Sequence, residues 1–141
     1  MTKPQVLFIC TANAARSQMA EGLLRAKYGD RYDAFSAGTR QSAVSSRAIA
    51  VMKEIGIDIS QHRSKNLDEF RGESIDIVVT LCDRAHETCP VFPHAKKTLH
   101  KGFRDPHAYG GSDEEILSDY RAVRNEIAAW IDTAFGTGNG P

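Results

Sequence analysis

The sequence has few of the features that mark exported, membrane-bound or polyanion-binding proteins. It has only three cysteines in 141 residues, an odd number that does not suit a paired extracellular disulfide framework. Its longest apolar runs, residues 6–10 and 77–82, are far shorter than the roughly 18 residues of a membrane-spanning helix, and its first residues do not form a signal peptide. The formal net charge is zero, which argues against nucleic acid or anionic lipid as a partner. These absences predict a cytoplasmic protein with no nucleic-acid or membrane partner.

The length and composition indicate one ordinary globular domain. A chain of 141 residues can bury about 68% of the surface that its unfolded form exposes, so a hydrophobic core suffices without disulfides. The sequence contains no internal repeat, low-complexity tract or linker. We predict a single domain over residues 1–135, followed by a flexible C-terminal tail over residues 136–141.

Apolar residues alternate between the spacing of strands and the spacing of helices along the chain. The predicted strands cover residues 6–9, 34–38, 75–81 and, as a weaker edge strand, 97–100. The predicted helices cover residues 17–28, 44–55 and 113–134, the last one preceded by Ser112 and Glu115 at the spacing of a capping box. Strands that alternate with helices favour a parallel sheet with right-handed crossovers. The predicted fold class is therefore α/β, with a four-stranded parallel sheet flanked by helices.

Two of the cysteines fall at the ends of predicted strands. Cys10 follows the first strand and Cys82 follows the third. Ligands of parallel α/β sheets bind at the carboxyl ends of the strands, so we expect both thiols to face the same crevice. In a reducing compartment such cysteines are either buried apolar fillers or reactive groups.

The loop between the first predicted strand and helix has the composition of an oxyanion-binding loop. Its backbone N–H groups and the positive end of the helix dipole can surround a tetrahedral oxyanion, and the planar guanidinium of Arg16 can hold two of its oxygens. The same field, with the hydroxyl of Ser17, favours the thiolate form of Cys10, a nucleophile at neutral pH. A lone cysteine is more often a buried filler, but the strand–loop–helix context favours catalysis. The candidate substrate-binding residues are Thr11, Ala12, Asn13, Ala14, Ala15, Arg16 and Ser17.

Three segments resemble a known family. Residues 6–22 are similar to the phosphate-loop segment of low-molecular-weight protein tyrosine phosphatases and of the arsenate reductases that share their fold. Residues 36–39 and 103–106 match two further signatures, so the resemblance extends from residue 6 to about residue 135. It implies a low-molecular-weight tyrosine phosphatase-like fold, with Cys10 as the nucleophile and Asp105 as the general acid that protonates a leaving oxygen.

A second pair of thiols distinguishes the two branches of this family. Residues 78–90 contain Cys82 and Cys89 and resemble the thioredoxin-coupled arsenate reductases. A phosphatase needs one thiolate and water, whereas reduction of arsenate to arsenite needs two electrons, which two thiols supply by forming a disulfide. The resemblance implies that Cys10 attacks arsenate, that Cys82 resolves the arsenylated Cys10, and that Cys89 then pairs with Cys82. Thioredoxin would reduce that disulfide, although glutaredoxin is the reductant of some relatives.

This pairing predicts a rearrangement of the segment between the two resolving thiols. If residues 82–89 formed one straight helix, their terminal Cα atoms would lie roughly 10 Å apart, beyond the ~7 Å that a disulfide allows. We therefore expect residues 82–89 to change conformation when Cys82 and Cys89 are oxidised.

A low-molecular-weight phosphatase is the first alternative. It would act on phosphotyrosine or a small phosphoester with Cys10, Arg16 and Asp105 alone. Phosphatases of this family usually carry adjacent tyrosines after the Asp-Pro pair, whereas residues 107–109 of this chain are His-Ala-Tyr. That departure weakens the phosphotyrosine interpretation.

A non-catalytic metal or redox protein is the second alternative. Its ligands would be four soft side chains within thirteen residues, namely Cys82, His86, Cys89 and His94. Their spacing matches no common structural zinc pattern, so no metal site is predicted.

The loop departs from the family pattern at two positions. Ala12 stands where the family commonly has Gly, and Ala15 stands where it commonly has Cys. If position 12 requires a positive φ, Ala12 stores about 1 kcal/mol of strain. The absence of a thiol at position 15 removes a competitor for Cys10.

A further departure concerns potassium. Some reductases of the family hold this ion with residues that match Asn13, Glu21 and Ser36 and with a carboxylate where this chain has Lys65. We expect the Lys65 ammonium to take the place of the cation near Glu21. No cofactor is therefore predicted.

Overall fold

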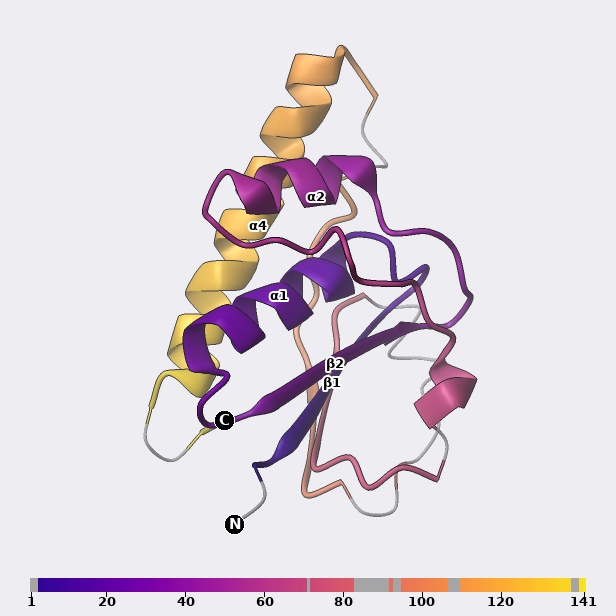
Figure 1. Cartoon of the computed structure of the whole chain (residues 1–141), viewed down its shortest axis with the longest axis vertical. Helices are drawn as coiled ribbons and strands as arrows, with labels where there is room; N and C mark the ends of the chain where they lie inside the picture. Colours follow the sequence, from indigo (N-terminus) through magenta and orange to yellow (C-terminus); the bar gives the residue numbers. More distant parts are fainter. Residues whose placement is uncertain (1–2, 71, 83–91, 93–94, 107–109, 138–139) are drawn as a thin grey trace.

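The computed structural model describes residues 3–70, 72–82, 92, 95–106, 110–137 and 140–141, and within these ranges the predicted parallel sheet is confirmed (Figure 1). Its strand order is β2-β1-β3-β4, and each neighbouring pair is parallel. The strands are β1 (Gln5–Cys10), β2 (Asp33–Gly38), β3 (Ile77–Thr80) and β4 (Lys97–His100). The central strands β1 and β3 are almost entirely buried, whereas β4 is largely exposed, as expected of an edge strand.

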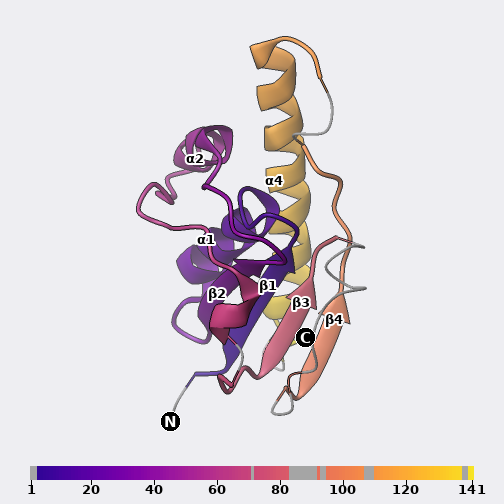
Figure 2. The same ribbon diagram turned by 90° about the vertical axis from the view of Figure 1, so that its right-hand side faces the viewer.

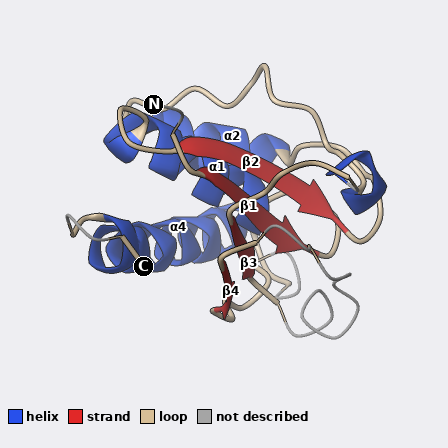
Figure 3. Cartoon of the chain, turned by 90° about the horizontal axis from the view of Figure 1, so that it is seen from below, coloured by secondary structure: helices blue, strands red, loops and turns tan. Residues whose placement is uncertain are grey.

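Three α-helices and a short 3₁₀ segment surround the sheet. They are α1 (Arg16–Tyr28), α2 (Ser46–Lys53), η1 (Leu67–Phe70) and α4 (Asp113–Phe135). α1 packs against β1 and β2 and lies beside α4, and α2 packs against α4 (Figure 2, Figure 3). None of the helices in the described ranges is long and apolar enough to cross a membrane.

The long helix α4 begins where its sequence predicted. The Ser112 hydroxyl accepts a hydrogen bond from the Glu115 backbone N–H at 3.2 Å, and the Glu115 carboxylate accepts one from the Ser112 N–H at 3.4 Å. This reciprocal pair is the capping box that satisfies two N–H groups of the first turn. At the other end of α4, the Phe135 ring contacts the rings of Phe8, Tyr32 and Trp130, which anchors the helix on the sheet.

The second helix is shorter than predicted. Ser45 caps the N-terminus of α2 by accepting a hydrogen bond from the Ala48 N–H, so Val44 lies before the helix. At the C-terminal end, Ile55 lies beyond the helix with 44% of its surface exposed, and Gly56 turns the chain with φ at +80°. The helix therefore contributes fewer residues to its apolar face than the sequence pattern indicated.

Candidate active site

The loop between β1 and α1 presents unpaired backbone N–H groups. Cys10 ends β1, and Ala15 precedes α1 with no side chain capping the helix. In the described part of the chain, the N–H groups of residues 12–15 make no hydrogen bond. Free N–H groups at the N-terminus of a helix are the usual binding site of an oxyanion.

The carbonyl groups of the same loop accept hydrogen bonds from residues outside the loop. The carbonyl of Cys10 accepts a hydrogen bond from the Thr39 N–H, and that of Thr11 accepts one from the Arg40 N–H, at 3.1 Å and 3.0 Å. The Ala14 carbonyl accepts from the Ser45 N–H at 2.8 Å, and the Ala12 carbonyl accepts from the Ser64 hydroxyl at 3.0 Å. These bonds turn the carbonyl dipoles away from the centre of the loop, which leaves it electropositive.

The strained position in the loop is Asn13, not Ala12. Among the described residues, Asn13 is the one non-glycine residue with a positive φ, at 51°. The expected strain at Ala12 was therefore misplaced. Asparagine tolerates this left-handed conformation better than most residues, and a buried side chain bonded to its surroundings, as that of Asn13 is, keeps it there.

The Cys10 thiol is bonded to the first turn of α1. Its sulfur lies 2.9 Å from the Ser17 hydroxyl oxygen, which also accepts a hydrogen bond from the Asn13 side-chain amide at 2.7 Å. Only 2% of the Cys10 surface is exposed. The sulfur is thus enclosed between the Ser17 hydroxyl and the N-terminus of α1.

Arg16 and Asp105 meet at the edge of the loop. The Arg16 guanidinium donates a hydrogen bond to the Phe103 carbonyl at 3.1 Å, and another of its nitrogens lies 3.9 Å from a carboxylate oxygen of Asp105. The Asp105 side chain is 47% exposed, whereas Arg16 is buried. The Asp105 carboxylate is therefore open to solvent at the rim of the loop.

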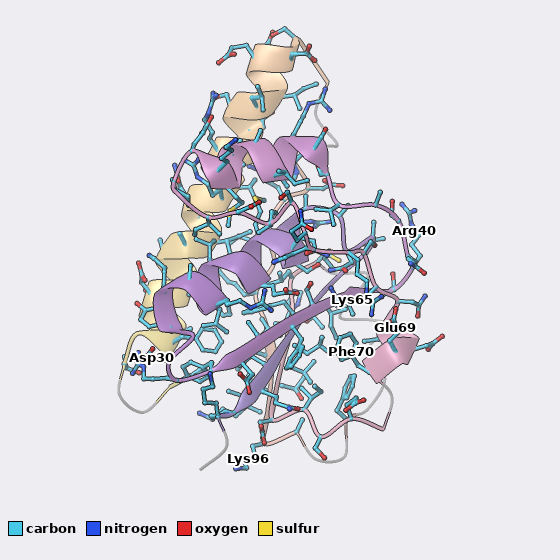
Figure 4. All side chains as sticks on the ribbon, viewed as in Figure 1. Asp30, Arg40, Lys65, Glu69, Phe70 and Lys96 are labelled. Carbon is cyan, nitrogen blue, oxygen red and sulfur yellow. The ribbon has the colours of Figure 1, made fainter. Side chains whose placement is uncertain are left out.

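A cavity of about 490 Å³ opens above the loop. Cys10, Arg16 and Asp105 line it together with residues 42–46, Arg47 and Tyr120. The sequence analysis missed Tyr120, because its place in the cavity depends on how α4 packs beside the loop. Arg40 and Arg47 also line the cavity, and Figure 4 shows Arg40 on the segment that follows β2.

Cys82 lies two residues after the end of β3, next to the loop. Its sulfur is 3.2 Å from the Thr11 hydroxyl oxygen, and 8% of its surface is exposed. Both Cys10 and Cys82 are thiols in the structure. The two strand ends thus bring Cys82 into contact with the loop, although Cys10 lines the cavity and Cys82 does not. Cys89, His86, His94 and residues 107–109 lie outside the described residues.

A charged cluster around Glu21 is connected to the loop through Lys65 and Asn13 and does not line the cavity. The Glu21 carboxylate accepts a hydrogen bond from the Ser36 hydroxyl at 2.6 Å, forms an ion pair with Arg25 at 2.9 Å, and lies 3.7 Å from the Lys65 ammonium. Burial lowers the pKa of Lys65, and Glu21 partly opposes that shift. Figure 4 shows Lys65 close to the short segment η1, which carries Glu69 and Phe70.

The residues that match the potassium ligands of some relatives have protein partners in this structure. The Glu21 oxygens already face Arg25 and Lys65, and the Asn13 side-chain oxygen accepts hydrogen bonds from the Lys65 N–H at 2.8 Å and from Gln18 at 2.9 Å. A further cation here would stand next to two positive side chains. In the described ranges, no group of three or more His, Cys, Asp or Glu side chains is arranged to hold a metal ion.

The fold and the loop together define a class of protein: α/β proteins that hold a tetrahedral oxyanion between a helix N-terminus and a nucleophilic cysteine. The model of the family described as "Low molecular weight phosphotyrosine protein phosphatase" matches residues 5–134. The chain belongs to this family, which confirms the resemblance found in the sequence. Among curated proteins, an arsenate reductase of Halalkalibacterium halodurans is 44% identical over 98% of this chain and 99% of its own length.

Solved structures of both branches of the family are similar to this chain. An arsenate reductase in its phosphate-binding state has a TM-score of 0.74 and 30% identity over 92% of this chain and 95% of its own. A low molecular weight protein tyrosine phosphatase from T. tengcongensis has a TM-score of 0.75 and 32% identity over 92% of this chain and 96% of its own. A thioredoxin-dependent arsenate reductase of Corynebacterium glutamicum has a TM-score of 0.65 and 28% identity over 93% of this chain and 63% of its own.

Proposed function

We propose that this protein reduces arsenate to arsenite through a relay of three cysteines and is regenerated by thioredoxin. The observation that carries the proposal is the second thiol at the loop, since the Cys82 sulfur lies 3.2 Å from the Thr11 hydroxyl. Hydrolysis of a phosphoester has no use for that thiol, whereas a two-electron reduction requires one. The 44% identical curated relative, an arsenate reductase over nearly its whole length, supports the same substrate.

The first step uses the oxyanion loop. The Cys10 thiolate attacks arsenic, a sulfur–arsenic bond forms, and one arsenate oxygen leaves as water after it accepts a proton from Asp105. The inward N–H groups of residues 12–15 and the Arg16 guanidinium hold the remaining oxygens, whose negative charge they offset. The Ser17 hydroxyl supports the thiolate until it attacks.

The second and third steps transfer the electrons. The Cys82 thiolate attacks the Cys10 sulfur, a disulfide forms, and the sulfur–arsenic electron pair stays on arsenic, which leaves as arsenite. Cys89 then attacks the Cys82 sulfur and releases the Cys10 thiolate. The dithiol of thioredoxin reduces the disulfide between Cys82 and Cys89 and becomes oxidised itself. Each turnover thus converts one arsenate and one dithiol into one arsenite, one disulfide and one water.

The choice of thioredoxin rests on the neighbour from Corynebacterium glutamicum, which is thioredoxin-dependent, and on the two resolving cysteines of this chain. Glutaredoxin is the competing reductant. Because thioredoxin and arsenate would meet the protein in a reducing compartment, we place its activity in the cytoplasm.

Phosphatase activity is the second candidate. The family model and the phosphatase from T. tengcongensis favour it, and so does a cavity of about 490 Å³, which has room for an organic group beyond a bare oxyanion. This activity would need Cys10, Arg16 and Asp105 but neither of the other cysteines.

One coupled assay separates the two candidates. Arsenate-dependent consumption of NADPH is measured with thioredoxin and thioredoxin reductase, and hydrolysis of para-nitrophenyl phosphate is measured in parallel. The proposal predicts that Cys10→Ser abolishes both activities and that Cys82→Ser and Cys89→Ser abolish arsenate reduction alone. Arsenate reduction that survives both Cys82→Ser and Cys89→Ser would disprove the relay. Replacement of thioredoxin by glutaredoxin in the same assay identifies the reductant.

A further part of the proposal concerns the cation. We propose that the Lys65 ammonium takes the structural role that potassium has in some relatives, because it lies 3.7 Å from Glu21 and its backbone N–H bonds Asn13. The enzyme would then need no metal or other cofactor.

A further inference from the structure

The cavity at the oxyanion loop is larger than arsenate requires. Its volume is about 490 Å³, which is the size of a site for a small organic molecule. The loop alone surrounds a tetrahedral oxyanion, whereas the lining also includes residues 42–46 and Arg47, which do not belong to the loop. The cavity therefore has room for an organic group that is attached to the oxyanion.

The uncharged part of the lining consists largely of small side chains. The loop contributes Ala12, Ala14 and Ala15, and the segment before α2 contributes Ala43 and Val44. Methyl groups of this kind take little space and make apolar contacts with a carbon skeleton. They suit a short skeleton that needs no hydrogen bond along its length.

The charged part of the lining is mainly positive. Arg16, Arg40 and Arg47 line the cavity, and Asp105 is the one acidic side chain among the described residues that line it. This excess of positive charge is local, because the formal net charge of the whole chain is zero. The potential in such a cavity favours a ligand with more than one negative group.

Arg40 is held beside the loop by its backbone and not by its side chain. Its N–H donates a hydrogen bond to the Thr11 carbonyl at 3.0 Å. Arg40 is exposed, and its guanidinium forms no hydrogen bond or ion pair with any residue that the structure describes. All of its N–H donors are therefore open to a ligand.

Arg47 is held by a contact that water weakens. In the described part of the chain, the one partner of its side chain is Asp113, at 3.2 Å. The Asp113 side chain is 91% exposed, and ion pairs of such exposed groups contribute little to stability. An anionic ligand in the cavity can therefore replace Asp113 at small cost.

We propose that Arg40 and Arg47 form a second anion subsite, so that the cavity binds a small organic phosphate whose skeleton carries a carboxylate or a second phosphate. The loop holds the phosphate, the small side chains contact the skeleton, and the two guanidinium groups bind the second anion, since their planar forks match carboxylate and phosphate alike.

This second subsite rests on the proposed function only through the oxyanion loop, and it involves neither Cys82 nor Cys89. Arsenate has no second anionic group and occupies the loop alone. An organic phosphate of the stated kind therefore competes with arsenate for the loop.

The test compares two ligands of the same shape and different charge, para-carboxyphenyl phosphate and para-carbamoylphenyl phosphate. They are titrated into the Cys10→Ser variant, which cannot form a sulfur–phosphorus bond, and calorimetry measures each Kd. We expect the carboxylate to bind about tenfold tighter than its neutral amide, and high salt to reduce this ratio. The meta isomer of the carboxylate and para-phenylene bisphosphate show which spacing and which second anion the subsite prefers.

Substitutions assign the preference to the two arginines. In the Cys10→Ser background, Arg40→Gln and Arg47→Gln together should bring the ratio to about one, with the Kd of phenyl phosphate unchanged. Arg63→Gln, at an exposed arginine that does not line the cavity, is the matched control and should keep the full ratio. Asp113→Asn removes the competing carboxylate and should raise the ratio about twofold, a gain that misfolding cannot produce.

Two results would overturn the second subsite. One is a ratio near one for every anionic ligand in the Cys10→Ser variant, and the other is a full ratio that survives the double substitution. Arsenate titrated into the same variant measures the loop by itself, so arsenate binding without a preference for the second anion would refute the subsite and leave the loop in place. Loss of the cysteine relay, in turn, would not alter these ratios.

Discussion

The Thr11 hydroxyl oxygen lies 3.2 Å from the Cys82 sulfur, which connects the residue after the nucleophile to the second residue beyond β3. The contact exists because β1 and β3 are neighbouring parallel strands that end at the same edge of the sheet. Two thiols from positions 72 residues apart thereby reach one oxyanion loop. The relay proposed for this protein depends on that topology.

Gly38 is expected to be indispensable for the shape of the loop. A Cβ atom at this position would lie 2.7 Å from the Asn13 backbone nitrogen and 2.7 Å from the Arg40 carbonyl oxygen. Since both are backbone atoms, neither can move without distorting the loop, and Gly38→Ala should lower the free energy of unfolding by about 2 kcal/mol or more. Chemical denaturation measures the change, and arsenate reduction should fall with it.

Gly110→Ala is the matched control for this prediction. A Cβ atom at Gly110 meets no atom of a described residue within 4 Å, so the substitution should change the free energy of unfolding by less than about 0.5 kcal/mol. Equal stability of Gly38→Ala and the parent would show that the loop tolerates a shift at this point.

Lys65 is expected to make the protein insensitive to potassium. Because its ammonium lies 3.7 Å from Glu21, the parent should show the same melting temperature and the same activity in potassium and in choline chloride at equal ionic strength. Lys65→Asp removes the positive charge and adds a carboxylate, so potassium should raise the melting temperature of this variant. Activation or stabilisation of the parent by potassium would contradict the assigned role of Lys65.

The lowered pKa of His62 should make the free energy of unfolding depend on pH. Burial lowers its pKa in the folded chain below the usual value of 6.5, so the unfolded chain takes up a proton first as the pH falls. In the window from 6.5 down to the folded-state value the unfolded state binds more protons, and the free energy of unfolding therefore decreases with falling pH. Between about pH 7 and pH 5 the parent should lose more stability than His62→Asn. Urea denaturation at a series of pH values measures this loss. An equal loss of unfolding free energy in the two proteins would refute the role given to His62.

The segment over residues 82–89 is expected to change conformation with redox state. A disulfide between Cys82 and Cys89 requires their Cα atoms to come within ~7 Å, closer than a straight helix of this length allows. Amide hydrogen exchange of residues 82–89 should therefore differ between the reduced protein and the protein oxidised by arsenate. Identical exchange in the two states would exclude the rearrangement.

Much of the fold could be predicted because its signals are local. β1 and β3 are apolar runs, and the Ser112–Glu115 box sets the start of α4, so these elements follow from neighbouring residues alone. Cys10 and Arg16 were identifiable for the same reason, since one loop carries both. The prediction for α2 was too long because Val44 and Ile55 continue its apolar pattern, although the Ser45 cap and the turn at Gly56 exclude them.

Other features of the site depend on contacts between distant segments. Which loop residue adopts a positive φ is decided by the bonds that hold Asn13 to Lys65 and Ser17, and these cannot be seen in the sequence. The contact between His62 and Gln18 spans 44 positions and likewise needs the folded structure. Long-range side-chain networks of this kind carry no periodicity that a sequence pattern could indicate.

A single-turnover experiment without thioredoxin tests the central claim most directly. The reduced protein is mixed with arsenate, arsenite is counted per chain, and the disulfide is mapped by mass spectrometry. The relay predicts one arsenite and a Cys82–Cys89 disulfide for the parent, one arsenite and a Cys10–Cys82 disulfide for Cys89→Ser, and no arsenite for Cys82→Ser. Release of a full equivalent of arsenite by Cys82→Ser would contradict the account.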